Sequence, residues 1–166
     1  MLAITETEKA YIAGFLDGDG CIMFQLVRRK DYKLGFQVRA SIVFYQKTSK
    51  KSFMSWLKSI FEVGYIRDRK DGMTEYTIVG LNPVKCALEL LEPYLMLKKD
   101  HAILAKRIFS LLWQKKPDSK ELVEIAKLVD KFKQLNYSKK RIITAKVVKD
   151  YLRNINCTPV TTDPIV

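Results

Sequence analysis

Two carboxylates separated by one glycine, Asp17 and Asp19, end the apolar stretch Tyr11–Gly20, which reads YIAGFLDGDG. If this stretch is a helix, both acids lie at its C-terminus, where the helix dipole places about −0.5 charge and disfavours carboxylates. A bound cation would offset that repulsion. Hard oxygen ligands suit Mg²⁺, which takes one or two carboxylates and completes its shell with water and substrate phosphate. Asp19 is the best candidate for a metal ligand, and an aspartate-rich turn without metal is the alternative.

Small residues on the same stretch could bring two such helices together. Ala10, Gly14 and Gly18 recur at positions i, i+4 and i+8, so they share one helix face. Because the distance between packed helices depends on the side chains at the contact, a face of small residues allows close approach. The stretch therefore predicts a close helix pair that presents acidic groups at its end.

The chain as a whole is strongly basic. Its 166 residues include 30 Lys and Arg against 18 Asp and Glu, for a net charge of +12. This excess favours a polyanionic partner such as nucleic acid, and a soluble protein with a solvated basic surface is the plain alternative. No apolar stretch approaches the ~18 residues of a membrane span, so we expect no membrane partner. One histidine and three cysteines without ligand spacing argue against a histidine-based triad and against structural zinc.

Capping signals and apolar periodicity predict the elements that position these residues. Thr5-x-x-Glu8 is a capping box that begins a helix near Glu6, and Gly18 and Gly20 end it at about Asp17. Strict alternation of apolar and polar residues predicts the two strands of a long hairpin. The strands cover 22–28 and 36–45 and are joined by a charged turn.

The remaining segments complete an α+β fold. They are predicted as a helix over 48–61 capped by Thr48, a hairpin of strands 65–69 and 74–79, a helix to Leu91 begun by Asn82-Pro83, and helices over 98–113, 119–135 and 139–154. Residues 6–92 thus form an α-β-β-α-β-β-α core, to which residues 98–154 add C-terminal helices. We expect a single domain over 1–154 and a flexible tail over 155–166.

Polar and basic side chains gather on or near the outward face of the four predicted strands. Arginine can bond guanine bidentately, glutamine can bond adenine, and a β-ribbon fits the major groove of DNA. The candidate DNA contacts are Gln25, Arg28, Arg29, Lys30, Tyr32, Lys33, Gln37, Arg39, Ser41, Tyr65, Arg67, Arg69, Glu75 and Thr77. Ser138, Lys139 and Lys140, at a predicted helix start, are candidates for a phosphate contact. A solvated sheet face and a solvated basic turn are the alternatives.

The motif and several further segments resemble one family. YIAGFLDGDG is similar to the motif of the LAGLIDADG homing endonucleases. The segments FYQKTSKKSF (44–53), GYIRDR (64–69), EPYLMLKK (92–99) and LNYSKKR (135–141) resemble the single-motif, homodimeric members found in algal organelle introns. The resemblance covers roughly residues 8–153. It implies the LAGLIDADG fold, in which an antiparallel sheet binds DNA.

The resemblance also implies roles for individual residues. Asp19 and the backbone carbonyl of Gly18 match the metal ligands, and the metal is Mg²⁺, for which Mn²⁺ can substitute. Gln46 matches the residue that positions the attacking water, and Lys50 matches a basic catalytic position. Lys98 matches the lysine that polarises water or steadies charge on the phosphate. Asp17 belongs to the motif, and we expect it to have a structural role at the helix end.

One motif per chain implies a homodimer, because a single Asp19 cannot serve two scissile phosphates. The predicted dimer interface comprises Ala10, Ala13, Gly14, Asp17 and Gly18. The resemblance implies a site-specific enzyme that hydrolyses double-stranded DNA at a long pseudo-palindrome and leaves short 3′ overhangs. It also implies an organelle, most often the chloroplast and otherwise the mitochondrion.

Two other functions use the same fold. One is an RNA maturase that binds its own intron, and the other is a DNA-binding regulator whose metal site has decayed. Asp19, Gln46 and Lys98 together argue against decay, because a pure binding protein would not need all three. They do not separate an endonuclease from a maturase that retains cleavage.

Overall fold

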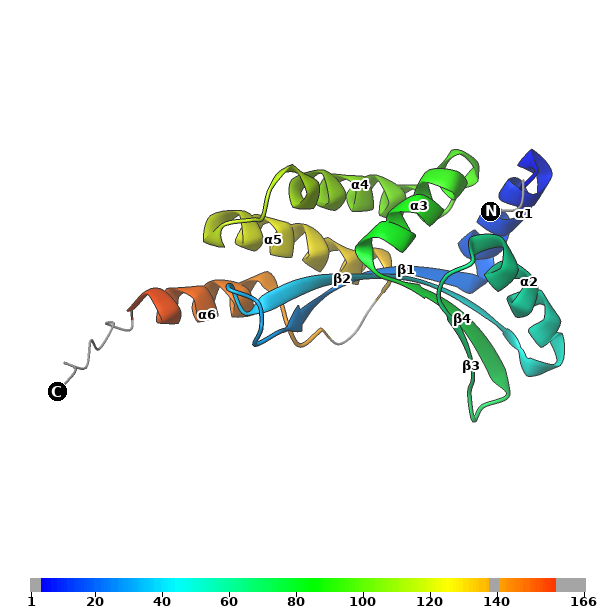
Figure 1. The fold of residues 1–166 in the computed structure, drawn as a ribbon, viewed down its shortest axis with the longest axis horizontal. Helices are drawn as coiled ribbons and strands as arrows, with labels where there is room; N and C mark the ends of the chain where they lie inside the picture. The colour runs from blue at the N-terminus through cyan, green and yellow to red at the C-terminus, as the bar shows by residue number, and fades with distance from the viewer. Residues whose placement is uncertain (1–3, 138–140, 158–166) are drawn as a thin grey trace.

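The computed structural model describes residues 4–137 and 141–157, which alternate helices with an antiparallel sheet (Figure 1). The elements are α1 (Glu6–Asp19), β1 (Gly20–Arg28), β2 (Phe36–Lys47), α2 (Lys51–Phe61), β3 (Tyr65–Asp68), β4 (Met73–Val79), α3 (Leu81–Leu91), α4 (Lys99–Gln114), α5 (Ser119–Leu135) and α6 (Ala145–Cys157), with short 3₁₀ turns at Thr48–Lys50 and Glu92–Tyr94. The predicted α-β-β-α-β-β-α order is therefore confirmed. No helix among the described residues is long and apolar enough to cross a membrane.

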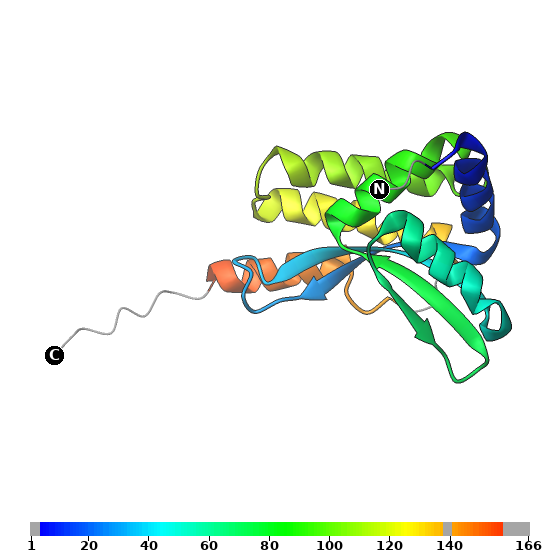
Figure 2. The same cartoon turned by 45° about the vertical axis from the view of Figure 1, so that its right-hand side comes forward.

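The four strands form one antiparallel sheet in the order β1-β2-β4-β3. Figures 1 and 2 show α3, α4 and α5 on one side of this sheet, with α1 and α2 near one end and α6 beside the β1–β2 hairpin. We call the side that carries these helices the helix-side face and the opposite side the outward face. The layers follow from the alternation in the sequence, because successive strand residues point to opposite faces.

The core fills the space between the helix-side face and the helices. Ile22, Phe24 and Leu26 of β1 are buried there, as the alternation predicted. The ring of Phe24 stacks on Phe132 of α5 with centroids 4.8 Å apart and meets Phe109 of α4 edge-on at 5.4 Å. These contacts hold the two longest helices against the centre of the sheet.

The end of α1 differs from the prediction. The helix runs to Asp19 rather than ending near Asp17, and Gly20 enters the strand at once with an extended backbone (φ −124°). Glycine is needed at Gly20 for space, because a Cβ there would lie 2.5 Å from Cδ1 of Leu16 and 2.9 Å from its carbonyl oxygen. Helix and strand are thus joined with no loop between them.

Two predicted N-caps are wrong. The Thr48 hydroxyl accepts a hydrogen bond of 3.1 Å from the Thr74 hydroxyl, so Thr48 serves the sheet, and α2 starts after a 3₁₀ turn without a side-chain cap. Asn82 lies inside α3, which starts at Leu81 with Gly80 as its N-cap and no side-chain cap. For Thr48, a tertiary contact replaces the local signal.

Of the last two helices, α5 follows the prediction and α6 departs from it. Helix α5 covers Ser119–Leu135 as predicted, and Asp118 and Glu121 cap it through two reciprocal hydrogen bonds of 2.9 Å. Helix α6 begins at Ala145 rather than at 139, because Asp130 of α5 accepts a 2.8 Å bond from the Ala145 backbone N–H. It extends to Cys157, past the predicted boundary at 154.

Candidate active site and nucleic-acid interface

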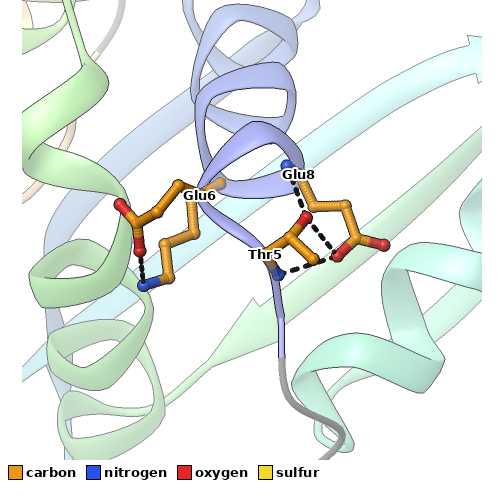
Figure 3. A network of polar contacts seen from close by, with 4 residues as sticks. Thr5, Glu6 and Glu8 are labelled. Carbon is orange, nitrogen blue, oxygen red and sulfur yellow. Dashed lines mark hydrogen bonds and ion pairs between the residues drawn. The ribbon is translucent and has the colours of Figure 1, made fainter.

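The predicted site depends on α1, which is fixed at its start by its own side chains. Thr5 and Glu8 form the predicted capping box: the Glu8 backbone N–H donates to the Thr5 hydroxyl at 3.2 Å, and the Thr5 backbone N–H donates to the Glu8 carboxylate at 2.9 Å (Figure 3). The Thr5 backbone N–H and, at 2.8 Å, the Thr5 hydroxyl both donate to the Glu8 carboxylate, and these two bonds lower the pKa of Glu8. An ion pair of 2.6 Å between Lys9 and Glu6 lies beside them. The other end of the helix carries the acidic motif.

Asp17 points into the protein and anchors the segment before α4. Its carboxylate accepts hydrogen bonds from the backbone N–H groups of Met96 at 2.7 Å, Leu97 at 3.1 Å and Lys98 at 2.9 Å. In return, Nζ of Lys98 donates to the Asp17 carbonyl oxygen at 2.6 Å. The side chain of Lys98 is therefore held at the end of α1, next to the acidic motif.

Asp19 has the opposite environment. Its side chain is exposed, and no other described residue forms a hydrogen bond or ion pair with its carboxylate. The Gly18 carbonyl oxygen lies in the last helical turn, where carbonyl groups lack the usual partner within the helix. A free carboxylate and a carbonyl oxygen of this kind are hard donors and fit Mg²⁺. Among the described residues no three His, Cys, Asp or Glu side chains cluster to hold a metal.

Gln46 lies at the same end of the sheet. Gly20, which follows Asp19, pairs with Phe44 of β2, and Gln46 is two residues further along β2, opposite Thr74. The Gln46 side-chain oxygen accepts a 2.9 Å bond from the Lys47 backbone N–H. Lys50 is exposed in the 3₁₀ turn that follows. The topology thus brings Asp19, Gln46 and Lys98 to one end of the molecule, with Lys50 on the adjoining connection.

The exposed face of α1 is smaller than the predicted interface. Ala10, Gly14 and Gly18 are exposed, and a Cβ added at either glycine would meet no described atom within 4 Å. Ala13 is fully buried in the core, and the Asp17 carboxylate is used within the chain. These two side chains are therefore not part of the exposed face, and their place in a dimer interface stays a prediction. Helical periodicity explains the difference, because Ala13 and Asp17, each one position before a residue of the stripe, turn towards the core.

Sequence reasoning missed a polar junction beneath this site. Asn136, just after α5, donates from Nδ2 to the Ile22 carbonyl at 2.9 Å, and its Oδ1 lies 3.0 Å from Nε2 of His101 and accepts from Sγ of Cys21 at 3.6 Å. Burial lowers the pKa of His101 and raises that of the Cys21 thiol. The junction ties β1 to α4 and α5. No sequence signal pointed to it, because its members are far apart along the chain.

The strand register places most predicted DNA contacts on the outward face. Gln25 pairs with Arg39, and one row across the sheet joins Tyr45, Glu75 and Arg67. The predicted residues that share this face are Gln25, Gln37, Arg39, Ser41, Tyr65, Arg67, Glu75 and Thr77. Arg69 follows β3, while Arg29, Lys30, Tyr32 and Lys33 lie at the tip of the first hairpin. Ser138, Lys139 and Lys140 fall outside the described residues.

Not every predicted DNA contact is open on the outward face, because Ser41, Glu75 and Thr77 are all buried there. The Glu75 carboxylate is buried on the outward face and pairs with Arg67 at 2.8 Å and with Arg69 at 4.0 Å. Arg28 lies on the helix-side face, and its guanidinium covers the ring of Tyr151 in α6. The expectation that Arg28 points outward is wrong, because it shares the parity of Leu26 and so the direction of the core residues.

Comparison with known proteins adds independent findings. A family model described as "LAGLIDADG endonuclease" matches residues 12–107. The DNA endonuclease I-CvuI of Chlorella vulgaris is 40% identical over 146 residues, covering 88% of this chain and 90% of that protein. The DNA endonuclease I-CreI of Chlamydomonas reinhardtii is 33% identical over 146 residues, with coverages of 88% and 89%.

Solved structures agree with these sequence relationships. The crystal structure of I-CvuI with its DNA target in the presence of Ca superposes with a TM-score of 0.83 at 39% identity, covering 90% of this chain and 95% of the other. A second I-CvuI complex, with the I-CreI target in the presence of Mg and with DNA not cleaved, gives a TM-score of 0.84 at 38% identity, with coverages of 93% and 98%. The architecture described above is therefore that of these DNA-bound proteins.

Proposed function

This chain belongs to the LAGLIDADG endonuclease family, and from that premise we propose that it is a homing endonuclease that cuts both strands of a long, pseudo-palindromic DNA site. The observation that carries the proposal is the free carboxylate of Asp19 at the end of α1, beside the anchored Lys98. A protein that only binds DNA has no need for an unpaired acid beside a fixed lysine. The two relatives compared above are named DNA endonucleases, which supports the same activity here.

The catalytic roles follow from the positions of the side chains. Asp19 and the Gly18 carbonyl would hold the divalent metal, with Mg²⁺ proposed and Mn²⁺ able to substitute. When bound, the metal supplies an activated water and stabilises charge on the leaving oxygen. Lys98 places a positive charge beside the phosphate, and the amide of Gln46 orients the attacking water. Lys50 adds positive charge near the strand end.

A second copy of the chain completes the site. Two α1 faces built from Ala10, Gly14 and Gly18 can approach closely because no side chain stands between them. Tyr11, Met96 and Leu97 border this face and are 58%, 84% and 77% exposed, so a dimer would bury apolar surface that the single chain leaves in water. A two-fold axis along the helix pair brings one Asp19 from each subunit to the centre.

The sheets supply recognition in this proposal. Each outward face reads one half-site of about 10 bp, one turn of DNA, and the net charge of +12 favours the phosphates. Cleavage across the minor groove leaves short 3′ overhangs. Both endonuclease relatives come from algae, and we extend to this chain the role of an intron-encoded enzyme in a chloroplast or mitochondrion.

The test is cleavage of a randomised duplex library with Mg²⁺, followed by sequencing of the cut ends. We expect one long site with 3′ overhangs, which Asp19→Asn should abolish while leaving DNA binding largely intact. Asp150→Asn makes the same chemical change at an exposed position of α6 and should cut normally. Cleavage by Asp19→Asn at the normal rate would overturn the metal assignment.

The same assay separates the alternatives. A regulator would bind duplex DNA equally with and without Mg²⁺ and give no product. A maturase would bind its structured intron RNA under conditions where duplex DNA stays uncut. Either result from a protein that is dimeric in solution would replace the endonuclease proposal.

A further inference from the structure

Helix α6 meets the β1–β2 hairpin at a cluster of three side chains, Arg28, Phe36 and Tyr151. Arg28 and Phe36 are paired across the two strands, and Tyr151 lies on α6. The guanidinium carbon of Arg28 is 5.1 Å from the Phe36 ring centroid and 4.8 Å from that of Tyr151, while the two rings meet edge-on at 5.1 Å and 86°. No described carboxylate pairs with Arg28, so cation–π contact is its described interaction.

The cluster also touches the backbone that closes the hairpin. Gly35 has φ +72°, and a Cβ there would lie 2.6 Å from Cε1 of Tyr151 and 2.8 Å from its hydroxyl oxygen. The ring of Tyr151 therefore rests directly on Gly35. Gly35 in turn accepts a 3.0 Å bond from the Arg29 N–H and donates a 2.8 Å bond to the Tyr32 carbonyl. A displacement of the Tyr151 ring would therefore shift the Gly35 backbone and, through its hydrogen bonds, the loop 29–35.

The loop so held carries basic residues that the proposed function assigns to DNA. Lys30, Tyr32 and Lys33 are exposed or half-exposed at the tip, and Arg29 is fixed to Asp31 by two bonds of 2.9 and 2.7 Å. From Gly20 to Arg28 the strand rises ~26 Å at about 3.3 Å per residue, which matches roughly 7–8 bp of DNA. The tip thus lies over the outer part of a half-site, far from Asp19.

We propose that Arg28, Phe36 and Tyr151 form a positioning cluster through which α6 sets base preference at the outer positions of each half-site. None of the three reads a base. Arg28 faces away from the outward face and acts through the loop 29–35, so its charge fixes the hairpin rather than a phosphate. The inference rests on the proposed function in one respect: the outward face and this loop must bind DNA.

The test compares cleavage profiles over a library randomised at every half-site position. Arg28→Met removes the charge and keeps the chain length, and Tyr151→Leu removes the ring. We expect discrimination at the outer positions to fall ~10-fold, the size of one lost base contact, while the inner positions keep their profile. Arg28→Lys and Tyr151→Phe, which retain charge and ring, should restore the outer profile. The cleavage rate on the preferred site should change less than the profile.

A purely structural role predicts another result. The variants would then lose thermal stability, and their cleavage would fall by the same factor for substitutions at every half-site position. That outcome would overturn the inference, and so would an unchanged profile in Arg28→Met. If Tyr151→Leu fails to fold, Arg28→Met carries the test, because Arg28 is an exposed strand-end residue. If the wild-type chain cuts no duplex, the proposed function fails and the inference with it; if the wild type cuts and the profiles coincide, only the inference fails.

Discussion

Asp17 and Asp19 are the same residue type two positions apart, yet the structure gives them opposite environments. Two helical positions differ by about 200° around the axis, so one side chain points inward when the other points outward. Asp17 is 8% exposed and accepts three backbone N–H bonds, whereas Asp19 is exposed and unpaired among the described residues. The acidic motif is therefore one structural acid and one chemically available acid.

The first prediction concerns the structural acid. Asp17→Asn replaces one carboxylate oxygen by an NH₂ group that faces backbone donors, so at least one buried N–H loses its acceptor. We expect the free energy of unfolding to fall by about 2 kcal/mol. Cleavage should slow as well, because the segment that carries Lys98 is no longer held. Denaturant unfolding and the cleavage rate check both effects, with Asp150→Asn as control; unchanged stability would contradict the bonding of Asp17.

The second prediction concerns His101, the only histidine of the chain. Burial holds its pKa below the ordinary value of 6.5, so the unfolded chain takes up a proton at a pH where the folded chain stays neutral. The stabilisation is therefore complete above pH 6.5 and is lost as the pH falls below it. We expect the free energy of unfolding to drop by up to about 1.4 kcal/mol per pH unit in this window.

The control for this effect is His101→Gln, whose amide can still donate to Asn136 but does not titrate. Its free energy of unfolding, measured between about pH 7.5 and 5.5, should lack the histidine part of the slope. Equal slopes in both proteins would mean that His101 is not the titrating group.

At the scale of elements, α1 exposes a face on which Gly14 and Gly18 have no side chain and Ala10 has only a methyl group. The third prediction is that Gly14→Leu breaks the proposed dimer without harming the subunit, because no described atom lies within 4 Å of the new Cβ. Replacing a helical glycine should even favour the isolated helix slightly. Sedimentation should show a folded monomer that no longer cuts DNA. A leucine at exposed Lys120 of α5 is the control, and a dimeric, active Gly14→Leu protein would contradict the helix pair.

Local signals predicted most of these elements correctly. The alternation over 22–28 identified the buried face of β1, and the capping box at Thr5 marked the start of α1. Such signals act within a few residues, so they survive in the fold. Thr48 and the segment after 138 were misplaced because the deciding bonds, to Thr74 and from Asp130, come from residues distant along the chain.

The exposure of residues at the candidate site was predictable where it follows from helical spacing alone. The helical spacing of Gly14 and Gly18 gave the exposed face, and the position of Asp19 at the helix end gave the free acid. Arg28 was misassigned because its charge was given more weight than its strand parity. The role of Asn136 could not be predicted, since it depends on three segments meeting in space.

At the scale of the whole molecule, the basic side chains behind the net charge of +12 are not all equally free to contact a phosphate. Arg39 is exposed on the outward face and has no described carboxylate partner, whereas Arg67 is paired with Glu75 at 2.8 Å. The fourth prediction is that Arg39→Ala lowers the salt dependence of DNA binding more than Arg67→Ala does. Each lost phosphate contact should reduce the slope of log K against log salt by about 1 per subunit.

The measurement uses the Asp19→Asn background, so that the DNA stays intact during titration. Lys127→Ala, an exposed lysine on α5, serves as the control and should leave the slope unchanged. Equal losses for Arg39→Ala and Arg67→Ala would show that the ion pair with Glu75 opens on DNA.

Because α1 passes directly into β1, the protein can tolerate no change of chain length at this junction during evolution. Asp19 and Gly20 are consecutive, with no spacer to absorb an insertion or deletion. One residue gained or lost there would turn every side chain of β1 to the opposite face of the sheet. An insertion, for example, would put Phe24 on the outward face in place of Gln25. The chain length between Asp19 and the β1 residues of the outward face is therefore fixed, so this part of the face changes by substitution, and within the β1–β2 hairpin the tip at 29–35 is where length can vary.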